Sequence, residues 1–409
     1  CDWSSDVCSS DLTGQAFGAP PVGVQIRSTS SYYTNGTPLD KFTPRFGFAW
    51  RPSKGNRTSV RGGYGWFYQT PVFSGNGTGA PLFTSAPFAQ SFTNTDVSNG
   101  ASNLAKPFPT VTLGFVPRTL TSQLSDRVAG PEYKIPLLQQ WNLSAQYGLT
   151  KTLTLDLGYV GSYGTDLLLA HGLNQPLLAT ASSPVNCGYD GIAADCITTN
   201  TTLNSRQRVP VLGENPNALL ASEFSGTSSY NSLQATLRKS LSQGLTFQFA
   251  YTFSKAINNT TVLNDQNNVD GSRARASFDR THRIIANFNY ELPSVGRHGM
   301  SKLLLAGWSA TGLFIMQSGL PMTLTDRSGG VYGRAATSTV TLCPGSTYGD
   351  LVTSGSPQER LNNWINRGAI CSAAVAGADR TATAYGASGQ NIINGPTQMN
   401  TDFSLGKSG

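Results

Sequence analysis

The chain has 409 residues and a formal net charge of +7, and only 12 % of its residues are charged, about half the ~25 % typical of soluble domains. Low charge with a modest 38 % of hydrophobic residues and 44 glycines is typical of alternating strands joined by polar, glycine-rich loops. The basic residues are scattered, so no nucleic-acid partner is expected, and no run of ~18 apolar residues exists that could form a transmembrane helix.

The first twelve residues, CDWSSDVCSSDL, resemble the translation of a common sequencing-adapter oligonucleotide. We expect residues 1–12 to be an artefact and residues 13–409 to be the protein; the alternative is a genuine serine-rich N-terminus. A charged n-region followed by an apolar h-region is not found, so a signal peptide is expected to be absent or lost with a missing N-terminus.

Two strands are predicted in residues 46–50 and 58–68, where aromatic residues alternate with small or polar ones. The polar stretch RPSKGNR between them predicts a turn. Arg61 lies on the face opposite Val60, Tyr64 and Trp66. A long segment rich in Gly, Pro, Ser and Thr then covers residues 70–135.

Two further hairpins have the same alternation. The first joins residues 141–149 and 153–160 through a tight turn at Thr150 and Lys151, and a long polar segment follows from residue 165 to 227. The second joins strands ending near Leu237 and beginning at Leu245 through a turn around residues 242–244. A loop over residues 255–278 separates this hairpin from the next.

A fourth hairpin begins in the stretch FDRTHRIIANFNYELP and continues through GWSATGLFIMQSGLP. Its strands are predicted over residues 283–292 and 302–318, and Pro293 and Gly296 interrupt the alternation between them. A final long loop leads from residue 320 to about 399, and a ninth strand is predicted at residues 400–406.

The connections alternate in length, which is typical of outer-membrane barrels with short periplasmic turns and long extracellular loops. The strands run about ten residues or more, enough to cross a bilayer when tilted. We therefore predict an all-β fold, an antiparallel up-and-down transmembrane β-barrel that is incomplete, with about nine strands. An open edge in lipid would leave backbone groups unpaired, so a complete barrel has to close.

The two faces of the predicted strands differ in chemistry. In a membrane barrel the apolar face meets outer-membrane lipid and the polar face lines a wet lumen. The aromatic residues expected to face lipid are Tyr68, Tyr147, Tyr159, Phe247, Phe249, Tyr251, Phe253, Phe288, Tyr290, Trp308 and Phe314. The residues expected to face the lumen are Arg61, Asn142, Gln146, Gln248, Asn287 and Asn289. An aromatic girdle near the long loops is predicted from Tyr68, Tyr163, Tyr230 and Tyr251.

The strand sequences resemble those of TonB-dependent receptors, nearest to the Oar-like group with a carboxypeptidase-regulatory-like N-terminal domain. The resemblance is carried by FTPRFGFAWRP, SVRGGYGWFYQ, QQWNLSAQYGL, YNSLQATLRKSLSQGLTFQFAYTFSKAI, FDRTHRIIANFNYELP, GWSATGLFIMQSGLP and NGPTQMNTDFSLGKS, and it is absent from the long loops. It implies part of a 22-stranded barrel that lacks its plug and last strands, in the outer membrane of a Gram-negative bacterium. It also implies energy coupling to TonB, ExbB and ExbD through the plug, and uptake of an unidentified extracellular substrate: a peptide, a glycan or a chelate.

Little in the sequence indicates catalysis, so we expect no enzyme, cofactor or metal site. The three histidines are dispersed and no carboxylate or cysteine accompanies them at metal-ligand spacing. His282 is expected to be a hydrogen-bonded residue at the rim. GNGTG at residues 75–79 is not a phosphate-binding loop, and NDQNNVDG at residues 264–271 misses calcium-loop spacing and is expected to be a solvated turn.

Four cysteines lie in predicted extracellular loops, where oxidation during passage through the periplasm is expected. Pairing within each loop predicts the disulfides Cys187–Cys196 and Cys343–Cys371; free or mispaired thiols are the alternative.

Two other functions stay open beside the transport barrel. One is a passive porin or a surface adhesion or secretion-associated β-barrel, which would lack a plug. The other is a soluble secreted β protein, in which the polar rows of Asn, Gln and Thr would have to be buried in a core.

Overall fold

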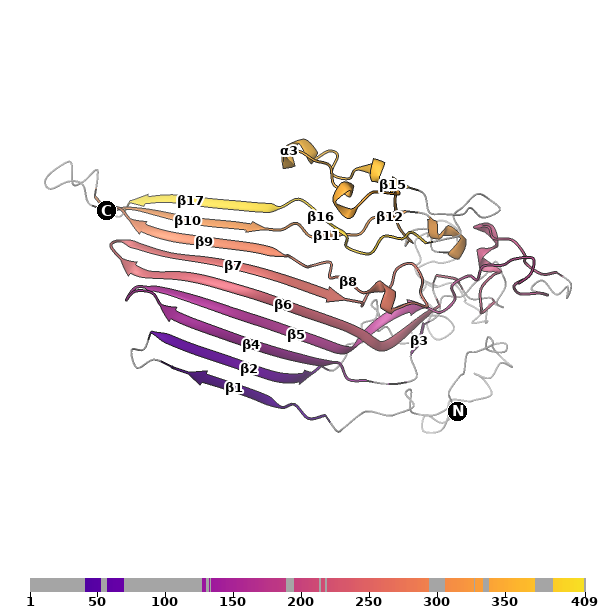
Figure 1. The fold of residues 1–409 in the computed structure, drawn as a ribbon, viewed down its shortest axis with the longest axis horizontal. Coiled ribbons are helices and arrows are strands. Elements are labelled where there is room, and N and C mark those ends of the chain that lie inside the picture. Colours follow the sequence, from indigo (N-terminus) through magenta and orange to yellow (C-terminus); the bar gives the residue numbers. More distant parts are fainter. Residues whose placement is uncertain are drawn as a thin grey trace, which may run out of the picture.

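The computed structural model describes residues 41–52, 57–69, 127–129, 132, 134–188, 195–212, 215–217, 219–293, 306–326, 328–333, 338–371 and 385–407. These residues form one large sheet of long strands, with the short turns at one end and the long loops gathered at the other (Figure 1). The adapter-like residues 1–12 and the GNGTG stretch lie outside the described residues.

Nine strands follow one another across the sheet, each antiparallel to its neighbour. In spatial order they are β1 (Arg45–Trp50), β2 (Thr58–Tyr68), β4 (Leu137–Gly148), β5 (Leu153–Gly172), β6 (Leu220–Ser242), β7 (Leu245–Asn258), β9 (His282–Glu291), β10 (Trp308–Gln317) and β17 (Gln398–Lys407). Two short strands join from the side, β3 (Arg127–Ala129) on β6 and β8 (Ala274–Arg275) on β7. The predicted antiparallel all-β fold is confirmed, and over the described residues the sheet is open, with β1 and β17 at its two ends.

The long loops carry only short elements. The strands are β11 (Pro321–Met322), β12 (Thr325–Asp326), β13 (Ser338–Thr339), β14 (Thr341–Leu342), β15 (Ile370–Cys371) and β16 (Ile393–Asn394). The helices are the one-turn α3 (Pro357–Arg360) and the 3₁₀ turns η2 (Leu203–Arg206), η3 (Asp270–Ser272), η4 (Ser328–Tyr332), η5 (Tyr348–Leu351) and η6 (Arg367–Ala369). Across the described ranges, none of the helices has the length and apolar character of a membrane span.

The short turns have the residues that tight hairpins need. Gln243 and Gly244 connect β6 to β7 with φ values of 55° and 75°, and two consecutive positive φ angles match the type I′ turn that suits twisted strands. In the β4–β5 turn, the hydroxyl of Thr150 accepts hydrogen bonds from the backbone N–H groups of Thr152 and Leu153. Both turns lie where the sequence predicts them.

Several predicted boundaries are wrong. β4 begins at Leu137 and not at residue 141, and β7 continues to Asn258, where a loop was expected from residue 255. The polar segment expected at residues 165–227 is shorter, because β5 continues to Gly172 and β6 begins at Leu220. A register shift between Gly164 and Leu167, with Asp166 at φ 55°, breaks the two-residue period that the prediction relied on. Of the strand expected at residues 302–318, residues 302–305 lie outside the described residues, residues 306 and 307 form a bend, and β10 begins at Trp308.

The register divides the sheet into two faces that run across all strands. On the face called here the apolar face, Leu143 lies opposite Tyr159, Tyr159 opposite Leu233, and Leu233 opposite Phe253. The other face, called the polar face, has neighbouring rows of Ser, Gln, Thr and Arg. Glycines on the apolar face provide room for rings of the adjacent strand: a Cβ at Gly312 would collide with the Phe288 ring.

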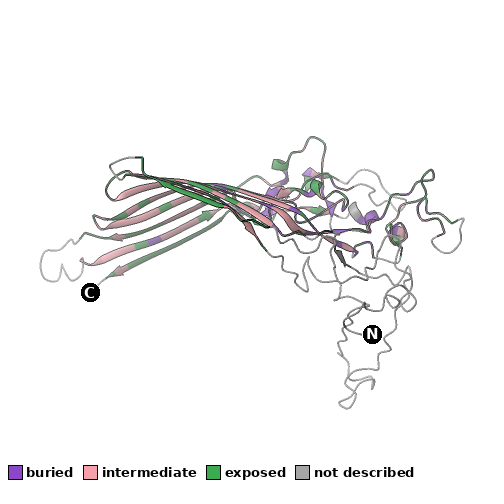
Figure 2. Ribbon diagram, turned by 90° about the horizontal axis from the view of Figure 1, so that it is seen from below, coloured by how far each residue is buried: buried purple, intermediate pink, exposed green. Residues whose placement is uncertain are grey.

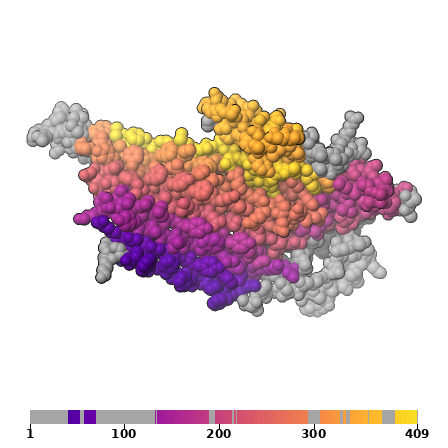
Figure 3. All heavy atoms as spheres, viewed as in Figure 1, coloured from indigo at the N-terminus to yellow at the C-terminus, as the bar shows by residue number. Residues whose placement is uncertain are grey.

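Buried residues of the described chain concentrate in the loops and toward the loop ends of the strands. Figure 2 shows the strands mostly exposed or intermediate along the sheet, with buried residues at the loop end. One loop cluster contains Leu351, Ala369 and Ile393. The space-filling view in Figure 3 shows the long β10–β17 loop, in orange and yellow, projecting beyond the sheet at the edge that carries β17. The buried apolar residues of the described strands of the large sheet, Leu169, Ala221, Phe224 and Ala256, lie toward the loop end, and the rest of the described sheet has no packed core on either face, unlike a soluble sandwich.

Candidate functional site

A pocket of about 420 Å³ opens on the polar face at the loop end of the sheet. Its wall combines polar strand residues of β6, β7, β9 and β10 with a short irregular segment that precedes β9. The lining residues are Tyr230, Gln234, Thr252, Ser254, Ala256, Phe278, Asp279, Arg280, Arg283 and Gln317. We call this the polar-face pocket.

The irregular segment between β8 and β9 is a bulge of four residues opposite one residue of β7. The backbone N–H of Ala276 donates to the carbonyl of Ala256, and the backbone N–H of Ser254 donates to the carbonyl of Thr281. Residues 277–280 therefore lie opposite the single residue Lys255 of β7. Bulges of this kind redirect side chains out of the regular two-residue alternation. The bulge thereby brings its side chains to the pocket formed by the polar face.

Asp279 replaces a backbone acceptor within this bulge. Its Oδ1 accepts the N–H of Ala256 at 2.7 Å, and its Oδ2 lies 3.8 Å from Nη1 of Arg275. Asp279 is 3 % exposed, so the carboxylate satisfies a buried N–H that the interrupted ladder would otherwise leave unpaired. The same residue thus holds the bulge and places a negative charge in the pocket wall.

Two arginines bring positive charge to the same pocket. Nη1 of Arg280 donates to the carbonyl of Ser318 at 2.6 Å, which leaves its other N–H groups available. Arg283, the first polar-face residue of β9, is exposed, and no side chain or carbonyl among the described residues forms a hydrogen bond or ion pair with it. The pocket therefore offers unsatisfied donors to a ligand.

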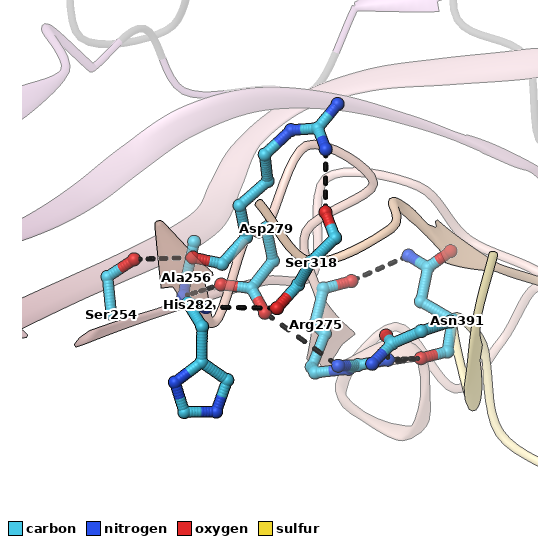
Figure 4. Close-up of polar contacts among 9 residues, drawn as sticks. Ser254, Ala256, Arg275, Asp279, His282, Ser318 and Asn391 are labelled. Carbon is cyan, nitrogen blue, oxygen red and sulfur yellow. Dashed lines mark hydrogen bonds and ion pairs between the residues drawn. The ribbon is translucent and has the colours of Figure 1, made fainter. Parts of the chain in front are cut away.

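The bulge is also tied to the C-terminal loop. Figure 4 shows Arg275 lying between Asp279 and Asn391. Arg275 donates to the carbonyl of Asn391 through Nε and Nη2, and the amide of Asn391 donates back to the carbonyl of Arg275 at 2.6 Å. A second link joins the backbone N–H of His282 to the hydroxyl of Ser318 at 3.1 Å. The long β10–β17 loop is thus fastened to the strand end that carries the pocket.

The register assigns the predicted face residues consistently. Arg61, Asn142, Gln146, Gln248, Asn287 and Asn289 share the polar face, and the aromatic residues expected to face lipid share the apolar one. None of the six polar residues lines the polar-face pocket. Within the predicted girdle, Tyr230 is misplaced: it lies opposite Ser162 and Ala256 on the polar face and lines the pocket.

The two predicted cysteine pairs are joined in the structure as disulfides, Cys187–Cys196 and Cys343–Cys371. The first lies in the β5–β6 loop and the second joins residues on either side of the short β14–β15 pair. The loops also contact each other, because the buried guanidinium of Arg208 donates to the carbonyls of Leu177 and Val331.

His282 has the hydrogen bond expected of a rim residue. Its Nδ1 lies 2.8 Å from the hydroxyl of Tyr251, and its ring packs against those of Tyr251 and Phe253 on the apolar face. Among the residues with assigned positions, no group of three or more His, Cys, Asp and Glu side chains converges in a way that could hold a metal. His298 lies outside the described residues.

A third histidine forms a buried polar cluster where β5 and β6 extend past their neighbours. Nε2 of His171 lies 3.5 Å from Oε1 of Glu223, and Nδ1 lies 3.1 Å from the carbonyl of Gln266. The Glu223 carboxylate raises the pKa of His171, and His171 lowers the pKa of Glu223 in turn. Gln266 is 1 % exposed, so the expected solvated turn at residues 264–271 is wrong at its centre.

Sequence reasoning missed the pocket because its key residues precede the regular strand. Asp279 and Arg280 lie in a bulge whose side-chain directions do not follow alternation, and Tyr230 was read as part of a girdle. The available signal is FDRTHR itself, which crowds three charged residues at the start of a strand in a chain with few charges.

The comparison with solved structures finds similar chains at low sequence identity. Similar chains include the outer membrane transporter YddB from Escherichia coli, at 11 % identity and a TM-score of 0.36, covering 68 % of this chain and 29 % of that one. A chain of the FpvAI–pyocin S2 complex matches at 10 % identity and a TM-score of 0.32, covering 70 % of this chain and 23 % of that one. The siderophore receptor PirA from Acinetobacter baumannii matches at 8 % identity and a TM-score of 0.35, covering 72 % of this chain and 32 % of that one. This chain spans under a third of each of those chains.

No curated protein matches the chain. A family model described as an outer membrane beta barrel domain does match, over residues 10–408. That match covers every strand of the sheet, and the sheet has the antiparallel, up-and-down order that such barrels require. This is an outer-membrane protein, and it belongs to the outer membrane β-barrel domain family.

Proposed function

We propose that the chain forms part of the wall of a TonB-dependent receptor of the Oar-like group, which takes up a peptide, glycan or chelate across the outer membrane. The observation that carries this proposal is the polar-face pocket at the loop end of a sheet whose other face is apolar. A receptor needs such a binding surface on the side from which its substrate arrives, whereas a passive pore needs only a wet channel.

In this proposal the apolar face, from Phe48 to Phe403, contacts lipid and the polar face contacts the lumen. Aromatic and leucine side chains there are well exposed, with Tyr159 at 42 % and Leu233 at 54 %. Lipid would cover this apolar surface, which water would otherwise contact at a cost. The loops with the two disulfides would then lie outside the cell.

The proposed partners follow from the resemblance to TonB-dependent receptors. Energy would come from TonB, ExbB and ExbD through a plug that lies outside residues 13–409, and further strands would complete the barrel. The polar face would then enclose a lumen that the plug occupies. We propose no catalytic activity for the chain.

The experiment compares uptake and conductance for the full-length protein that contains this chain. If the proposal holds, deleting tonB in the host abolishes uptake of the cognate nutrient, and the purified protein gives no steady conductance in a planar bilayer. Steady open-channel conductance, together with uptake that is the same with and without tonB, would establish the passive porin instead. Absence of heat-modifiable migration and of partition into detergent would contradict both membrane functions.

A further inference from the structure

The charges of the polar face are separated along the strands. The row through Arg283 contains Thr252, Gln234 and, at its far end on β2, Arg61. Where the strands pair in regular register, the carboxylates of the polar face in the nine described strands are those of Asp156, Glu291 and Asp402, and all of them lie on the short-turn side of this row. Asp166 and Glu223 lie on the loop side, at or beyond the register shifts of β5 and β6, and Glu223 pairs with His171. The regularly paired part of the polar face from this row to the loop end therefore contains arginines and no carboxylate, and is called here the cationic half.

The polar-face pocket lies in this cationic half. Arg280 and Arg283 give it two positive charges and Asp279 gives it one negative charge. Asp279 is additionally compensated by Arg275, which lies outside the pocket lining. The remaining lining is neutral and consists mainly of hydroxyl and amide side chains, so the pocket has a small positive excess.

Arginine favours one kind of ligand group in such a setting. Its planar guanidinium matches the two oxygens of a carboxylate, and charge-assisted hydrogen bonds of this kind are roughly twice as strong as neutral ones. Arg283 has N–H donors that no described residue uses. A carboxylate with a single charge would balance the excess, whereas a multiply charged phosphate would exceed it and meet Asp279.

The pocket also has an apolar wall on one side. Phe278, at the tip of the bulge, is 68 % exposed although it is a large aromatic residue. Phe278 precedes Arg280 by two residues and lines the same pocket as Arg280 and Arg283. An exposed ring next to unsatisfied arginine donors suits a ligand whose carboxylate adjoins an apolar group.

We propose that the polar-face pocket binds a carboxylate-bearing ligand, with Arg283 and Arg280 holding the carboxylate and Phe278 contacting its apolar part. This inference rests on the uptake function proposed above, since it names the chemical class of the substrate. Asp279 acts here as a positioning residue, because it holds the bulge that places Phe278 and Arg280.

The test uses a matched pair of probes on the full-length protein that contains this chain, purified in detergent. N-acetyl-phenylalanine has the carboxylate and the ring, and N-acetyl-phenylalaninamide has the ring without the charge. Isothermal titration calorimetry at low salt should give at least tenfold tighter binding of the acid. Arg283→Gln should weaken binding of the acid by tenfold to a hundredfold, the range for hydrogen bonds to charged groups, and leave the amide unchanged.

Arg61→Gln is the control, because Arg61 belongs to the same cross-strand row but lies outside the pocket. It should change the affinity for the acid by less than twofold. Equal binding of acid and amide, binding of neither probe, or equal losses in R61Q and R283Q would overturn the inference. The acid–amide comparison needs no variant, so a folding defect cannot obscure it.

Uptake in the tonB deletion strain separates this inference from the proposed function. TonB-dependent uptake in a protein that binds acid and amide equally would remove the carboxylate inference and keep the transport function. If the protein binds the carboxylate but its uptake does not depend on TonB, the inference about the pocket stands and the proposed TonB coupling is contradicted.

Discussion

Removing the side chain of Asp279 should open the strand end that carries the pocket. In Asp279→Ala, the N–H of Ala256 loses its acceptor at 2.7 Å, and Arg275 loses the carboxylate 3.8 Å away. Both Ala256 and Asp279 are buried, at 5 % and 3 % exposed, so water cannot readily replace the acceptor. An unsatisfied buried donor costs about 1–3 kcal/mol.

Amide hydrogen exchange at Ala256 measures this cost directly. A loss of about 1–3 kcal/mol in local opening free energy corresponds to exchange about fivefold to 150-fold faster in Asp279→Ala. Asp279→Asn is the matched control, because its amide oxygen still accepts the Ala256 N–H while the charge is lost. Amide exchange at Ala256 should be accelerated much less in Asp279→Asn than in Asp279→Ala.

The reasoning fails if exchange at Ala256 is unchanged in Asp279→Ala. It also fails if Asp279→Asn and Asp279→Ala accelerate exchange equally, because the charge and not the acceptor would then hold the bulge. Exchange in the β6–β7 turn, at the other end of the strand, should be the same in both variants and gives the baseline.

Three further predictions concern packing, pH and the loops. Gly312→Ala should destabilise the folded protein by about 1–3 kcal/mol in urea unfolding, because the new Cβ meets a facing phenylalanine ring, whereas Gly158→Ala, with its nearest atom at 3.9 Å, should be close to neutral. The ion pair of His171 and Glu223 should stabilise the extended β5–β6 hairpin fully between pH 4.5 and 6.5. This stabilisation should be lost above that range as His171 loses its proton, and below it as Glu223 gains one. Glu223→Gln should lower the pKa of His171 in an NMR titration. Removing the disulfide with a sequence separation of 28 should loosen its loop more than removing the one with a separation of 9, because the loop-closure free energies are about 3.6 and 2.6 kcal/mol. Limited proteolysis should therefore cleave the longer loop earlier.

The strands and their faces could be predicted because alternation is a local property. Each residue from Asn142 to Tyr147 has its face decided by its parity, and pairing only has to preserve that parity across the sheet. The turn at Gln243 and Gly244 could also be predicted from the sequence, because its positive φ angles restrict which residues can occupy it.

Features that break the alternation could not be predicted in the same way. Because of the register shift near Asp166, residues 165–172 of β5 were not predicted as strand, and because of the bulge at residues 277–280 the pocket was not predicted. Contacts such as Arg275 with Asn391, separated by 116 residues, depend on how two loops meet and leave no periodic trace in either. Sequence patterns therefore indicated the sheet and its faces, and the candidate site needed the three-dimensional arrangement.

The orientation of the sheet in the membrane is the claim on which the others depend. A spin-label scan of β4, one cysteine substitution at a time from Asn142 to Tyr147 in the full-length protein in lipid bilayers, tests it most directly. Positions 143, 145 and 147 should be accessible to oxygen, which concentrates in lipid, and positions 142, 144 and 146 to a water-soluble nickel reagent. The opposite phase, or no alternation, would contradict the assignment of the apolar face to lipid.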